Sequence, residues 1–239
     1  MTNKTVSPHQ QAILVGEAYQ QFAAAVATMN DERSWLPTEC VGWSVRDLVF
    51  HCLGDAQRGL VALHTPAHTL TGRAADRDAV TYWADWQPDP TAVGAAAGRR
   101  FIRVVASMFL RVEQLSELYV ETATALVHAA KQADPDELIA TQGHVLTAGD
   151  LLSTLAVEAT IHHLDLAASL CDGPDVEAMM PAPSGLAEVR RTLDGLLGQP
   201  VPLDWDDATY ARKGTGRAPL SLAERQQLGA LADRFPLFC

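Results

Sequence analysis

The 239-residue sequence predicts a mainly α protein, a four-helix bundle followed by a short C-terminal extension. In four long segments, apolar residues recur at steps of three and four, which is the period of a helix with a buried face. Strand signals are nearly absent before residue 173, where the composition becomes rich in Pro, Gly and Asp. We therefore expect the bundle over residues 1–172 and the extension over residues 173–239. The 48% of hydrophobic residues suffices for one sizeable core.

The first two predicted helices flank a loop. Residues 8–29 carry apolar side chains at helical spacing. Ser44, with Asp47 three positions later, is typical of a capping box, so the second helix is expected to begin there and to end near Thr65. Residues 65–90 mix polar residues, Gly and Pro with two tryptophans, and they predict a long irregular connection.

The other two bundle helices lie in the middle of the chain. The helical signal returns over residues 91–133, as one long helix or as two with a break near residues 107–110. Thr147 and Asp150 repeat the capping pattern and begin a further helix that runs through Leu170.

Two segments are expected to be irregular. The stretch "ADPDELIATQGH" is predicted to connect the last two bundle helices. The extension is expected to hold two short helices, at residues 185–197 and 221–234, with an irregular segment between them. A segment of this size is a tail packed on the bundle or a very small second domain.

Composition excludes several classes of protein. The net charge of −11 disfavours a nucleic-acid partner, which needs clustered Lys and Arg. No apolar run approaches a membrane span, and the start "MTNKTVSPHQQ" lacks the apolar region of a secretory signal, so we expect a cytoplasmic protein without membrane contact. The cysteines are far apart with no CxxC pair, and we expect core or idle thiols without a disulfide. They are Cys40, Cys52, Cys171 and Cys239.

The fourth bundle helix carries acids and histidines within an apolar stretch, "EATIHHLDL". On a helical wheel, Glu158, His162 and Asp165 lie at the centre of the apolar stripe. A buried carboxylate without a partner costs several kcal/mol, so it needs a counter-charge, a shifted pKa or a metal. Glu158 and His162 have the i, i+4 spacing by which one helix supplies two metal ligands. The alternative is a salt-bridged core pair neutralised by an arginine: Arg99, Arg100 or Arg103.

The second helix offers a third ligand. His51, in "RDLVFHCLGDAQRG", lies at the flank of the apolar stripe with Asp47, Asp55 and Arg58 on the same side. A single histidine in such a position is more often structural. Together with Glu158 and His162, however, it would complete a set of ligands that suits Zn²⁺ or another borderline divalent ion and leaves a position open.

Two stretches carry a family resemblance. "PTECVGWSVRDLVFHCLGD", followed about a hundred residues later by "LAVEATIHHLDLA", resembles the mycothiol-dependent maleylpyruvate isomerase family of the DinB-like superfamily of metal-binding four-helix bundles. The resemblance covers most of residues 8–172. It implies that His51, Glu158 and His162 match the ligands of the metal and that Asp165 matches the acid that closes the motif. The extension is shorter than the C-terminal α/β domain of the characterised isomerases.

These observations favour a thiol-dependent enzyme, an isomerase or an S-transferase, that uses a mycothiol-like thiol on a small electrophilic substrate. The metal would lower the pKa of the thiol. Asp165 would orient His162, and Arg58 would hold an anionic group of the substrate. One alternative is a metal-binding bundle without catalysis, acting as a sensor or binding a partner protein. Another is a metal-dependent hydrolase with Glu158 or Asp165 as the base. The sequence leaves an oligomer open.

Overall fold

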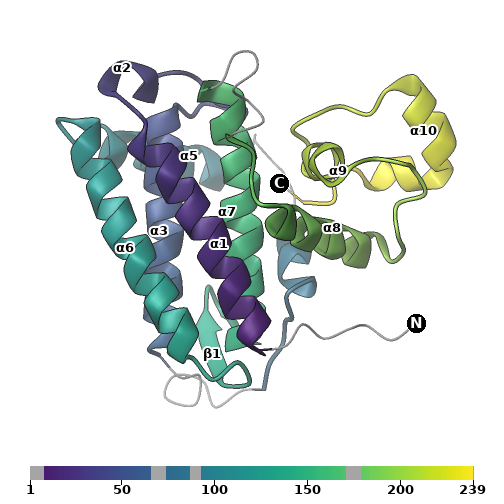
Figure 1. The fold of residues 1–239 in the computed structure, drawn as a ribbon. Coiled ribbons are helices and arrows are strands. Elements are labelled where there is room, and N and C mark those ends of the chain that lie inside the picture. Colours follow the sequence, from purple (N-terminus) through teal and green to yellow (C-terminus); the bar gives the residue numbers. More distant parts are fainter. Residues whose placement is uncertain (1–7, 66–73, 87–92, 171–178, 239) are drawn as a thin grey trace.

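The computed structural model describes residues 8–65, 74–86, 93–170 and 179–238. Its main body is a bundle of helices that run side by side in Figure 1, which confirms the predicted fold class. α1 and α3 each pack against both α6 and α7, so each of these four helices contributes one face to a shared core. Their bounds are Pro8–Ala27 for α1, Val45–Leu63 for α3, Val112–Gln132 for α6 and Ala148–Leu170 for α7.

The bundle core consists of large side chains that solvent does not reach. Tyr19 of α1 stacks on Tyr119 of α6 with ring centroids 6.5 Å apart, and Phe22 lies 5.2 Å from the same ring. Burial of one large apolar side chain stabilises a fold by about 1.5–3 kcal/mol. These contacts therefore fix the spacing of the helices. Other buried core residues include Val15, Leu48, Leu53, Leu115, Leu126 and Leu152.

Both predicted capping patterns are present. At the start of α3, Asp47 Oδ2 accepts hydrogen bonds from the backbone N–H and the hydroxyl of Ser44, each at 2.8 Å. Before α7, the Thr147 hydroxyl donates to Asp150 Oδ2 at 2.7 Å and accepts from the Asp150 N–H at 3.0 Å. These bonds satisfy N–H groups that have no partner within the helix. They confirm where the two predicted helices begin.

The region predicted as one or two helices over residues 91–133 contains two. α5 (Val93–Ala106) ends at a short break, and α6 begins at Val112. The break falls where the sequence places it. α5 packs on the outside of α3, while α6 takes its place in the bundle. Two short helical turns lie in the predicted connections, α2 (Asp31–Ser34) and the 3₁₀ helix η1 (Thr81–Asp85).

A β-hairpin occupies the stretch that the sequence predicts as a plain connection before α7. β1 (Leu138–Thr141) pairs antiparallel with β2 (His144–Thr147). The turn residues Gln142 and Gly143 have φ angles of 50° and 85°, as a tight two-residue hairpin turn requires. Strands of four residues are too short to show a clear alternation in the sequence, which is why the hairpin was missed.

The C-terminal tail, here residues 179–238, packs on the side of α7 that faces away from α3 (Figure 1). The two predicted short helices are present as α8 (Pro183–Leu197) and as α10 (Leu222–Leu228) with the 3₁₀ helix η3 (Gly229–Arg234). A third, α9 (Asp207–Gly214), lies in the segment predicted to be irregular. The predicted boundary at residue 172 lies outside the described residues.

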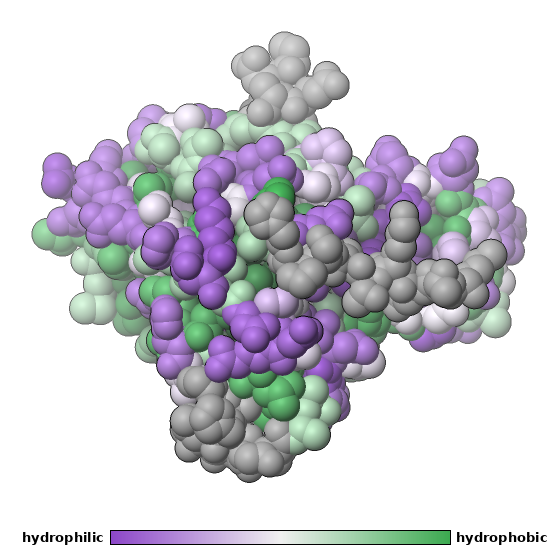
Figure 2. All heavy atoms as spheres, turned by 60° about the horizontal axis from the view of Figure 1, so that its bottom comes forward, coloured by the Kyte–Doolittle hydropathy of each residue, from purple (hydrophilic) through white to green (hydrophobic). Residues whose placement is uncertain are grey.

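α7 is buried on both sides. Its Leu152 and Leu155 belong to the bundle core, whereas Val157 and Ile161 belong to a second apolar cluster with Leu193 of α8. This position explains why α7 is apolar almost all round. None of the described helices has the length and apolarity of a membrane-spanning segment. Figure 2 shows polar and apolar side chains interspersed over one face of the molecule.

Candidate metal centre

Three side chains from two facing helices converge at one point. His51 comes from α3, while Glu158 and His162 come from adjacent turns of α7. His51 Nε2 lies 3.2 Å from Glu158 Oε1, and His162 Nε2 lies 3.5 Å from the same oxygen. The ligand atoms of all three lie within 4.8 Å of one another. The structure thus brings together the three residues that the sequence predicts as ligands.

The spacing of these atoms fits a divalent ion. Zn–N and Zn–O bonds of about 2.0–2.2 Å place neighbouring tetrahedral ligand atoms about 3.3–3.6 Å apart. The separations of 3.2 and 3.5 Å around Glu158 Oε1 are close to that range. Two imidazoles and one carboxylate without a thiolate are also a donor set that suits Zn²⁺ and leaves a coordination position open. The residues present therefore fit the group that the family resemblance implies.

Glu158 is held in its ionised form. Burial by itself raises its pKa, but hydrogen bonds from His162 and His51 outweigh burial, so the pKa lies well below its usual range. A carboxylate that stays charged at neutral pH is available as a ligand. His163, the next residue after His162, faces α1 instead, where its ring meets the Phe22 ring edge-on at 5.9 Å.

Asp165 orients the His162 ring by a contact with its Nδ1 atom. Asp165 Oδ2 accepts a hydrogen bond from His162 Nδ1 at 2.9 Å, and Nε2 of the same ring faces Glu158 and the candidate metal centre. Arg217 of the tail donates to Oδ1 at 2.6 Å and to Oδ2 at 2.8 Å. Burial by itself raises the pKa of Asp165, but the charge of Arg217 and the bond from His162 hold it well below its usual range. The completely buried acid is therefore charged and paired.

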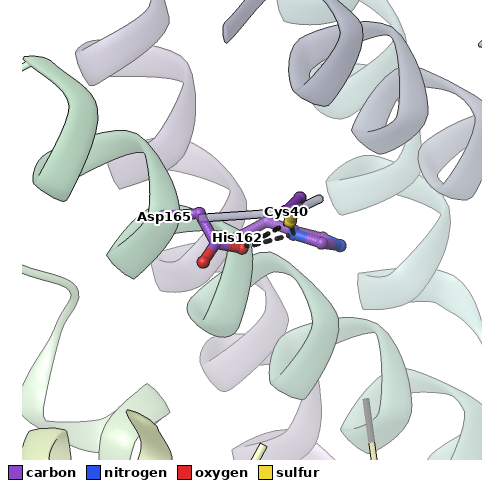
Figure 3. Close-up of side chains that lie close together, drawn as sticks. All are labelled: Cys40, His162 and Asp165. Carbon is purple, nitrogen blue, oxygen red and sulfur yellow. Dashed lines mark hydrogen bonds and ion pairs between the residues drawn. The ribbon is translucent and has the colours of Figure 1, made fainter. Parts of the chain in front are cut away.

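Cys40 joins the same network. Figure 3 shows its side chain directed toward His162 and Asp165. Its Sγ donates to Asp165 Oδ2 at 3.2 Å and lies 3.9 Å from His162 Nδ1. Cys40, His162 and Asp165 could in principle hold a cation themselves. Because both oxygens of Asp165 already accept bonds from a guanidinium, we interpret this cluster as the support of His162 and not as a second metal site.

Sequence reasoning missed two members of this network. Cys40 was expected to be an idle or core thiol, and the structure places it against Asp165. The arginine that balances the charge of the buried Asp165 is Arg217, for which the sequence suggested no partner. Nothing local marks Arg217, because it lies 52 residues after its partner. The contact exists only once the tail packs on α7. Cys40 and Cys52 are free thiols, and Cys171 and Cys239 lie outside the described residues.

Asp55 and Arg58 lie beside His51, as the spacing on α3 predicts, whereas Asp47 caps the helix. Asp55 Oδ2 is 3.2 Å from His51 Nε2, and Asp55 Oδ1 accepts a hydrogen bond from Arg58 Nη1 at 2.6 Å. Within the described part of the chain, the buried Oδ2 has no hydrogen-bond partner. Burial raises the pKa of Asp55, with Glu158 adding to the effect of burial and His51 opposing it. Asp55 Oδ2 therefore lies against the candidate ligand His51 without forming a hydrogen bond.

The candidate ligands form part of the wall of a large pocket. Its volume is about 650 Å³, and residues of α3, α7, η1, the hairpin and the tail line it. The Trp43 ring packs against both ligand histidines, with centroids 4.8 Å from His51 and 6.4 Å from His162. Arg58 also lines the pocket, and its side chain is 45% exposed. A ligand in this pocket would thus reach the metal centre directly.

The fold and the converging side chains define a helical-bundle protein with a candidate site for a divalent metal. Sequence comparison then gives the family. The chain belongs to the family of the mycothiol maleylpyruvate isomerase N-terminal domain, whose model matches residues 15–167. The matched residues include His51, Glu158 and His162 and end before the tail. This match confirms the resemblance seen in the sequence.

The bundle also has a counterpart among solved structures. The chain is similar to the crystal structure of the mycothiol-dependent maleylpyruvate isomerase, with a TM-score of 0.52 and 16% sequence identity. The similarity covers 78% of this chain and 69% of that chain. At this identity it shows a shared fold. No curated protein matches the chain.

Proposed function

We propose that this protein binds one divalent ion, most simply Zn²⁺, through His51, Glu158 and His162. With it, the protein uses a low-molecular-weight thiol such as mycothiol to isomerise a small electrophile or to transfer sulfur to it. Family membership supports this proposal. The structural observation that carries it is the approach of both histidine Nε2 atoms to within 3.5 Å of Glu158 Oε1 at the wall of one pocket.

The contacts of each residue indicate what it would do in the proposed reaction. When bound, a divalent ion supplies positive charge that favours the thiolate form of an incoming thiol. Asp165 holds the proton at Nδ1 of His162 and so keeps the ring oriented. Arg58 is the proposed contact for an anionic group of the substrate, because it lines the pocket with its side chain partly exposed.

The sulfur is proposed to come from outside the protein. Cys52 is only 4% exposed, and burial raises the pKa of its thiol well above its ordinary value, which disfavours the reactive thiolate. Cys40 donates a hydrogen bond to Asp165 and belongs to the support of His162. An external thiolate that adds to a double bond forms a C–S bond and leaves a single bond that can rotate. Elimination of the thiolate then gives the isomer, whereas retention gives the conjugate.

Metal analysis tests the first half of the proposal. Wild-type protein loaded with Zn²⁺ and then freed of excess ion should retain about one equivalent, and His162→Ala should lose it because it removes one of three ligands. His128→Ala is the matched control, since His128 is exposed on α6. Retention of far less than half an equivalent by the wild type would refute the ligand assignment.

A thiol titration tests the second half. In protein loaded with Co²⁺, adding mycothiol should change the metal-centred absorption spectrum, and turnover of an unsaturated acid should require the thiol. A variant with Cys40 and Cys52 replaced by Ser should still turn over in the presence of mycothiol, although support of His162 by Cys40 is lost. A hydrolase or a bundle without catalysis would bind the metal and leave the spectrum unchanged by the thiol.

A further inference from the structure

The pocket has two chemically different walls. One wall carries the candidate ligands and Asp55. The other, here called the aromatic wall, consists of Tyr82, Trp83, Trp86 and Phe238. η1 and the residue after it supply the first three rings, and the end of the tail supplies Phe238. The function proposed above does not use these rings.

The aromatic wall is a cluster of packed rings in which Trp86 is 43% exposed, while Tyr82, Trp83 and Phe238 are buried behind it. Trp83 and Phe238 pack with centroids 4.4 Å apart and an angle of 30° between their planes. Tyr82 lies 5.3 Å from Trp83 and 6.1 Å from Trp86. Ile161, the residue before the candidate ligand His162, lines the same pocket and continues the apolar surface toward the metal centre. Such a surface binds apolar and aromatic groups, which prefer offset or edge contacts with rings.

The charges in the pocket leave Arg58 as a contact for one anionic group but do not favour a small substrate with several charges. Of the three arginines that line it, Arg58 bonds to Asp55 at 2.6 Å and Arg217 bonds to both oxygens of Asp165. Glu158 adds negative charge to the same lining, whereas Glu39 is paired with Arg212. A substrate with several carboxylates would therefore have to compete with Asp55 and Asp165 for the guanidinium groups of Arg58 and Arg217.

The volume of the pocket also favours a substrate larger than a small, highly charged acid. A volume of about 650 Å³ lies within the range of roughly 300–1,000 Å³ that encloses ligands of drug size. Such a pocket has room for a thiol and a ring-bearing electrophile. A ring that packs on Trp86 would exclude water from its exposed indole.

We propose that the electrophile taken by this pocket is an unsaturated carbonyl compound with an apolar group about the size of an aromatic ring. This group packs on the aromatic wall while the reactive double bond faces His51, Glu158 and His162. The inference rests on the proposed thiol chemistry and names its substrate class. In the reaction the S–H bond and the π bond between the α- and β-carbons break, the thiol sulfur bonds to the β-carbon, and the thiol proton ends on the α-carbon.

Three enones that differ in one substituent test the inference. Benzylideneacetone carries a phenyl group on the β-carbon, ethylideneacetone a methyl group and acetylacrylate a carboxylate. For metal-loaded protein with mycothiol, kcat/KM is divided by the rate constant of the uncatalysed thiol addition. This ratio should be at least about tenfold higher for benzylideneacetone than for the other two, since one methylene in an apolar pocket already changes kcat/KM by roughly tenfold or more.

Trp86→Ala and Trp35→Ala form a matched pair of variants. Both indoles are partly exposed, 43% for Trp86 and 52% for Trp35, so neither change threatens the core. Only Trp86 lines the pocket, and Trp35 instead packs under Arg46. Trp86→Ala should lower the preference for benzylideneacetone by several-fold, and Trp35→Ala should leave it unchanged. A preference for acetylacrylate, or equal effects of the two variants, would overturn the inference.

A binding measurement separates this inference from the proposed function. Benzylacetone and levulinate are the saturated, unreactive counterparts of the phenyl and carboxylate compounds, and ligand-observed NMR reports their binding without turnover. If benzylacetone binds more tightly than levulinate and Trp86→Ala weakens this binding, the proposed substrate class is supported. This holds even if no enone reacts with the thiol, because absence of reaction would refute only the proposed thiol function. Tighter binding of levulinate refutes the substrate class whether or not turnover is seen.

Discussion

Asp165 is completely buried, and the charge on its carboxylate is balanced by Arg217. Removing one partner of a buried ion pair leaves the other charge unpaired in a medium of low polarity. Arg217→Met should therefore lower the free energy of unfolding by about 3–5 kcal/mol. Urea unfolding followed by circular dichroism measures this loss.

Arg212→Met is the matched control for that prediction. Arg212 also belongs to the tail, but its partner Glu39 is 33% exposed, and an exposed pair contributes only about 0–1 kcal/mol. Equal losses from the two substitutions would show that the pair with Asp165 has no special importance. The double substitution Arg217→Met with Asp165→Asn should cost less than the sum of the single changes, because the two residues share one interaction.

The residues that sequence could identify are those with local patterns. Glu158 and His162 stand out because they interrupt an apolar stripe at i, i+4 spacing, and His51 stands out because acids flank it on the same helix. Cys40 and Arg217 carry no such pattern. Their contacts with Asp165 span 125 and 52 residues, so only the packed structure identifies them.

At the scale of helices, the approach of α8 to α7 depends on a glycine. A Cβ added to Gly185 would lie 2.4 Å from Thr160 Oγ1 and 3.3 Å from Thr160 Cγ2. Thr160 is buried in α7 and branched at Cβ, so it has little freedom to retreat. We expect Gly185→Ala to destabilise the protein by about 1–3 kcal/mol in urea unfolding.

A second glycine provides the comparison. Gly54 lies inside α3, and an added Cβ there would meet no atom within 4 Å. Gly54→Ala should therefore stabilise the protein by up to about 1 kcal/mol, the difference in helix propensity between the two residues. A stabilising effect at Gly185 as well would show that α8 can move away from α7 without cost.

The hydrogen bonds at the start of α10 predict that the stability of the protein depends on pH. A hydrogen bond from Lys213, with a further one from the Ser221 N–H, lowers the pKa of Glu224 from 4.5 to about 2. Because the pKa is lower in the folded state, the stabilisation is fully present above about pH 4.5 and is lost as the pH falls toward 2. Glu224→Gln should cost about 1 kcal/mol near neutral pH, allowing for solvent screening, and almost nothing near pH 2.

Urea midpoints of the wild type and of Glu224→Gln across this pH range measure the effect. Glu121→Gln, on the exposed face of α6, controls for the general change in net charge. A difference between Glu224→Gln and the wild type that does not shrink on acidification would contradict the assignment of the low pKa to these hydrogen bonds.

The helices show where sequence reading succeeds. α1, α3 and α7 were predicted because each has a long apolar period, and caps at Ser44 and Thr147 marked two of their starts. α9 and the hairpin were missed because both are short. Eight residues of α9, half of them charged or glycine, show little helical periodicity, and tertiary contacts with α8 and α7 decide their conformation.

For the whole molecule, the proposed metal adds stability to a fold that already has a large core. At a free-ion concentration of about 1,000 Kd, ligand binding stabilises the folded state by about 4 kcal/mol. For a chain of this size that corresponds to roughly 8–16 °C in Tm. Chelation should therefore lower Tm by this order without loss of helical circular dichroism at room temperature.

His51→Ala should abolish the response to chelator, because the ion would have lost a ligand. A complete loss of helical signal on adding chelator to the wild type would show instead that the bundle core is insufficient without metal. An unchanged Tm would show that the ligands bind no ion tightly.

The bond between Arg217 and Asp165 also sets an order of events during protein synthesis. A ribosome that has completed α7 has already produced every candidate ligand and Asp165, but it has not yet added the arginine that balances this acid. The nascent bundle would have to bury an unpaired charge or leave the end of α7 open. We therefore expect newly made chains to acquire their metal only after Arg217 has been added and has reached Asp165.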